Sequence, residues 1–371
     1  MTAGESHGKC LVAVLDGLPA GVPIDLGAID AEMKRRQFGY GRGPRMKFES
    51  DQVEILSGLR RGKTLGSPVA LQIMNKDFSI DRLPVVTQPR PGHADLTGAM
   101  KYDHRDIRNV LERASARETA ARVAVGAVCK QLLGHLDIEL ASHVVAIGSV
   151  HAKPAPSMSA GQVRKRADAS PVRCLDAQAT KNMVRAIDAC AKRGDTLGGV
   201  FEVLAEGAPP GLGSHVQYDR RLDAILGHAV LSIHAVKAVE VGDGVLGSSL
   251  PGSSVQDEIF YSKAKGFSRS SNRAGGFEGG MTTGQPIVVR GFLKPLSTLR
   301  KPLRSVEINT KRPVVATVER SDVCTVPAAG VIGEAMVAFE LARAVLEKFG
   351  GDSLRELTRN VDGYLRQLAK F

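Results

Sequence analysis

The sequence predicts an α+β fold that contains an internally duplicated α/β unit, and two observations carry this prediction. Segments with strand-like and helix-like apolar patterns alternate along the 371 residues. Two glycine turns also recur, Gly-x-Pro-x-Gly after a strand and Gly-x-Thr-x-Gly before one, at 17–21, 207–211, 62–66, 194–198 and 280–284. Because such self-similarity is typical of duplication, we expect one domain over residues 1–371 with a pseudo-repeat at approximately 1–150 and 190–345.

The apolar pattern also predicts the individual elements. Aliphatic runs predict strands at 10–16, 53–59, 68–74, 138–150, 198–206, 285–294 and 312–319. Helical spacing predicts helices at 27–37, 105–134, 178–193, 219–238, 330–349 and 353–369. The Pro/Ser-rich stretch 151–162 is expected to be a surface loop, and the polar, glycine-rich stretch 262–284 a functional loop.

Composition restricts the classes of function. An apolar content of 43% and a charged content of 24% are typical of a soluble globular protein. With 11 Phe, 5 Tyr and no Trp, the chain has few stacking platforms for single-stranded nucleic acid. The net charge of +11 indicates either a solvated basic surface or an anionic partner. Because the arginines lie in glycine-rich segments rather than in Lys/Arg blocks, discrete anion pockets are favoured over a nucleic-acid surface.

Cysteines and targeting signals point to the cytoplasm. The five cysteines are scattered and form no C-x-x-C pair, which argues against a disulfide framework or a zinc site. The start lacks a charged region followed by an apolar run, and no uninterrupted apolar stretch is long enough to cross a membrane. We therefore expect a cytoplasmic protein without a membrane partner.

Two of the nine histidines stand out. His7 and His93 lie between small residues, which leaves room around the imidazole for proton transfer at neutral pH. The structural or surface role that most histidines have remains the alternative for both. Neither has a second ligand at metal-binding spacing, and no Gly-x-Ser-x-Gly elbow marks a serine hydrolase.

Several arginines lie in segments that could bind an anion. Arg42 and Arg45 occupy a glycine-rich loop, where two guanidinium groups could converge on a carboxylate or phosphate. Arg113, Arg117 and Arg122 form either an ordinary solvated helix face or, with Ser115, an oxyanion or phosphate site. Asp322 could reach a site from a strand-to-helix turn or simply cap the helix. No P-loop or Rossmann glycine pattern is present.

Beyond these residue patterns, the chain resembles the chorismate synthase family along nearly its whole length. The resemblance rests on "TAGESHG", "RRQFGYGRGPRMKFESDQVEILSG", "RPGHADLTGAMKY", "LERASARETAARVAVGAV", "GDTLGGVFEV", "NRAGGFEGGMTTGQPIVVR" and "RSDVCTVPAAG". The segment "LERASARETAARVA" looks most like the monofunctional bacterial branch.

The resemblance implies a function. It suggests a lyase with a β-α-β sandwich fold that converts 5-enolpyruvylshikimate 3-phosphate to chorismate by trans-1,4-elimination of phosphate. This is the last common step of the shikimate pathway towards the aromatic amino acids. The family needs reduced FMN without net redox change, and is usually homotetrameric. The substrate's two carboxylates and phosphate fit the arginines and the basic charge.

The resemblance also assigns roles by position. His7 would protonate the departing phosphate, His93 would stabilise the negative charge of the reduced flavin, and Asp322 with Ser6 would relay a proton. Substrate contacts would come from Arg36, Arg42, Arg45, Arg90 and Arg117. Flavin contacts would come from Arg113, Ala114, Ser115, His234, Ala235, Gly279, Lys294, Pro295, Leu296, Ser297, Thr298 and Arg320.

Three departures and two alternatives qualify the resemblance. Ala114 stands where many members have serine, and His234 where Asn or Gln is commoner. The stretch between Asn75 and Arg90 is also shorter than in many relatives. An RNA-binding or scaffold protein that kept the fold is one alternative. The other is a bifunctional enzyme that reduces its flavin with NADPH; because no added reductase domain is visible, we expect an external flavin reductant instead.

Overall fold

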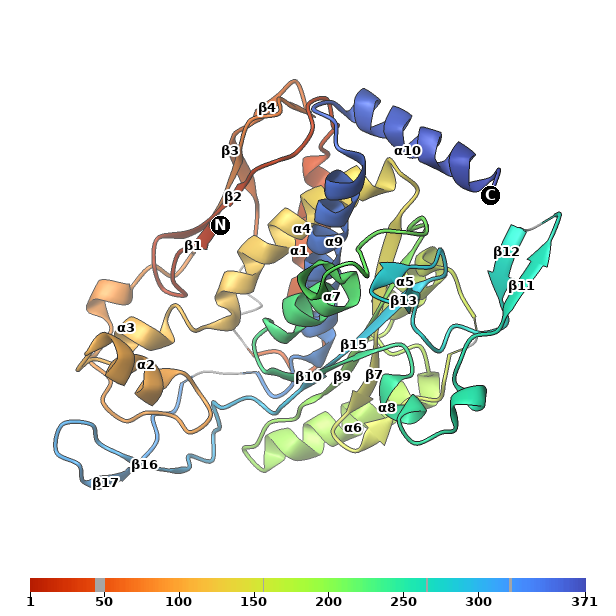
Figure 1. Ribbon diagram of the computed structural model, residues 1–371. Coiled ribbons are helices and arrows are strands. Elements are labelled where there is room, and N and C mark those ends of the chain that lie inside the picture. Colours follow the sequence, from red (N-terminus) through yellow and green to blue (C-terminus); the bar gives the residue numbers. More distant parts are fainter. Residues whose placement is uncertain (44–50, 156, 265, 320–321) are drawn as a thin grey trace.

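Two antiparallel sheets enclose a layer of helices (Figure 1). The computed structural model describes residues 1–43, 51–155, 157–264, 266–319 and 322–371. The first sheet has the order β1-β2-β6-β3, with β1 at Thr2–Ala3, β2 at Cys10–Leu15, β6 at Val69–Met74 and β3 at Glu54–Ser57. The second has the order β10-β15-β9-β7-β8, with bounds Val236–Val241, Ile287–Leu293, Gly199–Glu206, Glu139–Ile147 and Val150–His151.

The central layer contains α1 (Leu26–Gln37), α4 (Thr119–Gly134), α7 (Leu222–Leu231) and α9 (Val326–Phe349). Helix α4 contacts β2 and β6 of the first sheet, while α9 contacts β7 and β9 of the second, and the two helices pack on each other. The arrangement confirms the α+β class and is the β-α-β sandwich that the resemblance implies.

Smaller elements surround this sandwich. The other helices are α2 (Asp95–Tyr102), α3 (Arg108–Leu111), α5 (Ala160–Ala169), α6 (Ala177–Lys192), α8 (Gly244–Gly247) and α10 (Leu354–Leu368). Two-stranded ribbons are formed by β4 (Leu59–Arg60) with β5 (Lys63–Thr64), β11 (Ile259–Ser262) with β12 (Gly266–Arg269), β13 (Phe277–Glu278) with β14 (Met281–Thr282), and β16 (Arg304–Val306) with β17 (Pro313–Val315). The β11–β12 ribbon projects from the body (Figure 1).

The core is aliphatic except where glycines make room for a ring. In β2, alternation buries Leu11, Ala13 and Leu15. Phe201 of β9 is fully buried beneath α9. A Cβ placed on Gly291 or Gly333 would come within 2.4 or 2.5 Å of its ring, so both positions need glycine for this packing.

The repeated turns carry equivalent hydrogen bonds in the two halves. Near β2, the Thr64 hydroxyl donates to Pro19 O (2.6 Å) and accepts from Val22 N (2.9 Å). Near β9, Thr282 makes the same two bonds with Pro209 O (2.6 Å) and Leu212 N (2.8 Å). The third Gly-x-Thr-x-Gly turn differs, because Thr196 donates to Leu296 O. These bonds support the pseudo-repeat, whose boundaries remain a prediction.

Several expected elements differ in the structure. The helix expected at 105–134 is interrupted between α3 and α4. The helix expected at 219–238 ends at Leu231, because the chain reverses at Ala235, with φ +67°, into β10. Of the strand expected at 312–319, only Pro313–Val315 forms, in a ribbon outside both sheets. Helix α9 starts before residue 330, with proline in its first turn.

The loop expected at 151–162 is also partly helical. Helix α5 begins inside it, and Ser159 and Gln162 form a capping box there. In the described ranges, no helix has both the length and the apolar character needed to cross a membrane.

Candidate active site

The interruption between α3 and α4 is the centre of the candidate site. Ser115 has an extended backbone (φ −69°, ψ 140°), and its hydroxyl accepts a hydrogen bond from Arg117 N at 3.3 Å. The run Ser-Ala-Arg-Glu at 115–118 has the residue types of a helix start, which explains why the chain leaves one helix and begins another here. The break buries side chains that an uninterrupted helix would expose to water.

His7 is held against this break by Glu112. The His7 Nδ1 atom lies 2.6 Å from Glu112 Oε2, and the His7 backbone N–H donates to the same oxygen at 3.2 Å. Burial would raise the pKa of Glu112, but the hydrogen bonds and charges of His7 and Arg108 lower it below its usual value. Glu112 is therefore an ionised carboxylate next to the imidazole.

The rest of the N-terminal segment is fixed just as firmly. The Asn75 amide donates to Glu5 O (3.0 Å) and Gly8 O (2.7 Å), on either side of His7. Arg113 donates to Gly4 O (2.9 Å) and Thr2 O (3.1 Å). Ser6 is buried, with its backbone N–H donating to Glu112 O at 3.1 Å. These five hydrogen bonds with distant parts of the chain thus keep residues 2–8 in one place.

Three of the predicted substrate arginines pair with two carboxylates, of which Asp51 is buried and Asp322 is half-buried. Arg117 and Arg36 both contact Asp51, at 2.5 and 3.3 Å. Arg42 contacts Asp322 at 3.1 Å. Burial, together with the positive charges of Arg42 and Arg117, lowers the pKa of Arg36 to about 10 although Asp51 opposes the shift. The cluster therefore holds positive charges close enough to repel one another, and an anion would relieve this repulsion.

Asp322 does not cap α9. One of its carboxylate oxygens accepts from Gly43 N at 2.5 Å, and the other pairs with Arg42. The cap position belongs to Thr325. The structural alternative considered for Asp322 is therefore wrong, and its carboxylate lies in the arginine cluster.

His93 forms a second histidine–carboxylate pair. Its Nδ1 atom lies 2.5 Å from Asp95 Oδ1, and Asp95 Oδ2 accepts from Arg90 Nε at 2.8 Å. Burial opposes ionisation of Asp95, but its bonds to His93 and Arg90 lower its pKa strongly. Arg90 also donates to Thr298 at 2.8 Å, so this pair is joined to the 294–298 segment.

The 294–298 segment lies against the loop that carries His93. Lys294 Nζ contacts Gly92 O at 2.5 Å and Ser297 Oγ at 3.1 Å, and Ser297 Oγ donates to Gly92 O at 2.7 Å. A Cβ on Gly92 would come within 3.1 Å of the lysine nitrogen, so glycine permits this close approach.

His234 and Glu118 lie near the same region with unsatisfied polar atoms. His234 Nδ1 is 3.6 Å from Glu118 Oε1. Burial lowers the pKa of His234, and the charges of Arg122, His93 and Arg113 lower it further although Glu118 opposes them. Glu118 Oε1 pairs with Arg122 at 2.8 Å, whereas Glu118 Oε2 and His234 Nδ1 are buried without a hydrogen-bond partner within the described ranges. Buried polar groups of this kind need partners, so the place suits a polar ligand.

Not every predicted residue joins this site. Arg45 and Arg320 lie outside the described residues. Gly279 belongs to the β13–β14 turn at the start of β15, whereas Lys294 follows the end of β15, about seven strand residues away. The glycine-rich stretch expected to be a functional loop lies at that distant end. It is anchored there by Asp257, which accepts from the Arg273 and Ala274 N–H groups.

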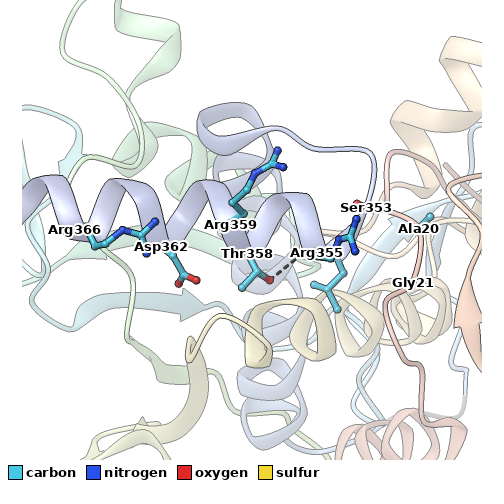
Figure 2. A pocket seen from close by; sticks show the side chains of 9 residues that line it. Ala20, Gly21, Ser353, Arg355, Thr358, Arg359, Asp362 and Arg366 are labelled. Carbon is cyan, nitrogen blue, oxygen red and sulfur yellow. Dashed lines mark hydrogen bonds between the residues drawn. The ribbon is translucent and has the colours of Figure 1, made fainter.

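A groove of about 830 Å³ lies elsewhere, where α10 meets the turn at Ala20 and Gly21 (Figure 2). Arg355, Arg359 and Arg366 line it, all from α10. Its lining contains neither the histidine–carboxylate pairs nor the Arg36 cluster, so the groove is separate from the candidate site. The described residues contain no group of three or more His, Cys, Asp or Glu side chains arranged to hold a metal ion.

Sequence reasoning missed the carboxylates and the amide that organise the site. Glu112, Asp51, Asp95 and Asn75 are all buried, yet none was singled out. Glu112 lies in an Arg/Glu-rich segment that resembles a solvated helix face. The signal that could have revealed it is the capping pattern at 115–118, which predicts a helix start and so a break just after Glu112.

The fold and the site together define a class of protein. A β-α-β sandwich that gathers buried arginines and two histidine–carboxylate pairs at a helix break suits an enzyme acting on a small anionic substrate.

Comparison with known proteins gives the family. The family model described as chorismate synthase matches residues 1–346. Proteins named chorismate synthase from Symbiobacterium thermophilum and Solibacter usitatus are 58% and 54% identical, over 100% of this chain and 99% of each relative. A solved structure titled "Crystal Structure of Chorismate Synthase" is 43% identical, with TM-score 0.84 over 100% of this chain and 98% of that one. The chain belongs to the chorismate synthase family, the lyases of the last common step of the shikimate pathway.

Proposed function

We propose that the chain eliminates phosphate from 5-enolpyruvylshikimate 3-phosphate with the help of reduced FMN, and that the site around the α3–α4 break carries the reaction. The observation that supports this most is the cluster of Arg36, Arg42 and Arg117. Guanidinium groups in such a water-poor place suit carboxylate and phosphate groups, which can accept several of their hydrogen bonds at once.

In this proposal the arginines bind and orient the substrate. Arg36 and Arg117 share Asp51, which fixes their positions before the ligand arrives. Arg90, fixed in the same way by Asp95, would contribute from the side of His93. Arg45 is included on the resemblance alone. Positions fixed in advance reduce the entropy lost on binding, so the substrate would be oriented at little cost.

His7 is the proposed acid for the departing phosphate. Its Nδ1 edge is occupied by Glu112, which leaves Nε2 as the nitrogen that could give a proton. Ser6 and Asp322 are the proposed partners in moving the second proton of the reaction. His93, oriented by Asp95, would place a hydrogen-bond donor or a positive charge next to the reduced cofactor.

The residues at the His234 end fit a flavin. Among the described residues, His234 Nδ1 and Glu118 Oε2 lack a hydrogen-bond partner and offer a donor or acceptor edge, and Lys294 with Arg113 supplies positive charge. We propose that Arg113, Ala114, Ser115, His234, Ala235 and residues 294–298 hold it. When bound, reduced FMN supplies transient electron donation and accepts the substrate proton. Gly279 lies too far from these residues to join them within one chain, and Arg320 rests on the resemblance.

One assay tests this function directly. Purified protein, reduced FMN and 5-enolpyruvylshikimate 3-phosphate are mixed without oxygen, and chorismate and phosphate are measured over time. We expect the two products in equal amounts, and none when FMN is omitted or kept oxidised. A folded protein that releases neither product would rule the proposal out.

The roles of the two histidines are tested by substitution. His7→Ala and His93→Ala should each slow turnover by about 10²-fold or more, as loss of a proton-transfer group does. His135→Ala is the matched control, because His135 is exposed at the end of α4 and should leave turnover unchanged. Near-normal rates in His7→Ala and His93→Ala would show that both histidines have a structural role and not a catalytic one.

The reductant and the assembly are tested separately. An aerobic assay with NADPH and oxidised FMN should yield no chorismate until a flavin reductase is added, because we propose an external reductant. Mass determination in solution should give four copies of the chain per particle if the assembly is the proposed homotetramer.

A further inference from the structure

We propose that Glu112 is a positioning residue that fixes both the orientation and the tautomer of His7, with Arg108 holding Glu112 in turn. This inference rests on the proposed function of His7. It adds two residues that the resemblance does not assign.

The geometry constrains His7 at three points. Glu112 Oε2 meets both the Nδ1 atom (2.6 Å) and the backbone N–H (3.2 Å) of the same histidine. The Glu112 carbonyl accepts from Ser6 N at 3.1 Å, so the main chains are joined as well. A carboxylate accepts hydrogen bonds, so Nδ1 carries a hydrogen and the ring is held in one orientation. The Nε2 edge then faces Asp77 Oδ2, which lies 3.8 Å away.

Arg108 keeps the Glu112 carboxylate ionised. It donates to Glu112 Oε1 at 2.9 Å, and both side chains are almost fully buried. Arg108 is itself held by Pro84 O at 2.9 Å and by Glu319 at 3.4 Å. A buried carboxylate that accepts from Nδ1 keeps the hydrogen on that nitrogen and holds the ring in one orientation, which a proton donor needs in order to meet its acceptor.

A substitution can separate charge from hydrogen bonding. Glu112→Gln keeps an oxygen that can accept from Nδ1 but removes the negative charge. Glu112→Asp keeps the charge but shortens the side chain by one methylene. If the Glu112 carboxylate positions His7 and fixes its tautomer, the Gln variant should be impaired in proton transfer and the Asp variant should recover part of it.

The test combines turnover kinetics with NMR of the His7 imidazole ring. In the reduced-FMN assay, Glu112→Gln should lower kcat by at least about tenfold with little change in KM, and should move the acidic side of the pH profile. Nitrogen-15 NMR of histidine-labelled protein should show His7 with hydrogen on Nδ1 in the wild type. It should show a mixture of ring forms in the Gln variant. Glu347→Gln, an exposed position on α9, is the matched control.

Each outcome decides the proposal. Wild-type kcat and pH profile in Glu112→Gln, with an unchanged His7 NMR signature, would overturn it. If Glu112→Gln removes the buried counter-charge of Arg108 and the protein fails to fold, Arg108→Gln/Glu112→Gln removes both buried charges and takes its place. If the wild type itself gives no chorismate, the proposed function fails, whereas the NMR comparison still decides whether Glu112 sets the state of His7.

Discussion

Arg117 shows how single side chains serve two purposes at this site. Its Nε donates to Asn75 at 2.9 Å, and its NH1 contacts Asp51 at 2.5 Å. The first bond supports the amide that holds the His7 segment, and the second belongs to the arginine cluster. One guanidinium therefore links the proposed acid to the proposed anion site, which a lysine with its single nitrogen could not do.

This gives a first prediction at the residue scale. Arg117→Lys should lower kcat/KM by about 10- to 100-fold, the loss expected for one or two charge-assisted hydrogen bonds. Steady-state kinetics with varied substrate measure the effect. Arg105→Lys serves as control, because that side chain is 73% exposed. Equal kinetics in both variants would show that the fork geometry of Arg117 is unimportant.

Asp95 gives a second prediction. It is 1% exposed and holds Arg90 and His93 together. Asp95→Asn should weaken flavin binding and lower stability by about 3–5 kcal/mol, because Arg90 keeps its buried charge without a full counter-charge. Flavin titration and thermal unfolding measure the two effects. Asp103→Asn, at a side chain 91% exposed, should change neither, and an unaffected Asp95→Asn protein would contradict the assigned role.

At the scale of elements, the close packing of α4 and α9 depends on a glycine. A Cβ on Gly126 would lie 2.3 Å from the Ala335 Cβ and 2.4 Å from its Cα, both in α9. Neither atom can move away without shifting α9, because a Cα and Cβ have no side-chain freedom. The helices are therefore in contact through their backbones at this point.

A matched pair of substitutions in α4 tests this contact. Gly126→Ala should destabilise the protein by about 1–3 kcal/mol through overpacking, seen as a lower melting temperature. Gly134→Ala lies in the same helix with no described heavy atom within 4 Å of the added Cβ. That variant should be unchanged or slightly more stable. A Gly126→Ala protein that melts like the wild type would show that α4 and α9 can separate freely.

Elements with a continuous local pattern were predictable from sequence, whereas breaks were not. Helix α1 and strands β2 and β6 agree with their predicted ranges to within a residue or two. The prediction of one helix over 105–134 was wrong because the apolar pattern continues through Ser115. There the side chain caps the following turn and the backbone is extended, which interrupts the helix. The predicted end of the 219–238 helix was wrong because the left-handed turn at Ala235 does not change the spacing of the apolar residues.

The site was predictable only in part, for a related reason. His7 and Glu112 are 105 residues apart, and a pairing over that distance depends on the fold rather than on any local motif. Gly-rich segments marked Arg42 and His93, whose membership of the site stays a prediction, because loops with small residues can admit ligands. They also marked 262–284, which the fold places at the far end of β15.

At the scale of the whole molecule, a buried group of charges joins the helical layer to the second sheet. Glu334 of α9 is fully buried and contacts Arg35 at 2.8 Å, Lys130, and Arg173 at 3.3 Å. Ser142 of β7 donates to it at 2.6 Å. Burial would raise the pKa of Glu334, but the surrounding cations hold it well below its usual value.

This group predicts how stability depends on pH. Because the folded-state pKa of Glu334 is depressed, its contribution is present above the unfolded pKa of about 4.3 and is lost as pH falls through the folded value. Glu334→Gln should cost about 3–5 kcal/mol at pH 7 and flatten the loss of stability below about pH 4. Urea unfolding at several pH values measures both. Glu347→Gln on the same helix should behave like the wild type, and a Glu334→Gln protein with unchanged stability would contradict this role.

Arg35 and Arg36 are neighbours in α1, yet one is bound by Glu334 and the other by Asp51. One turn of α1 therefore takes part both in the buried charges that stabilise the fold and in the proposed substrate site. A shift of this turn would disturb both. A laboratory screen for inactive variants should accordingly recover changes at Glu334 and Lys130, positions that no ligand in the proposed site would touch. Conversely, an engineer who wishes to accept a bulkier substrate has little freedom in α1, because two adjacent side chains there belong to two different groups of charges.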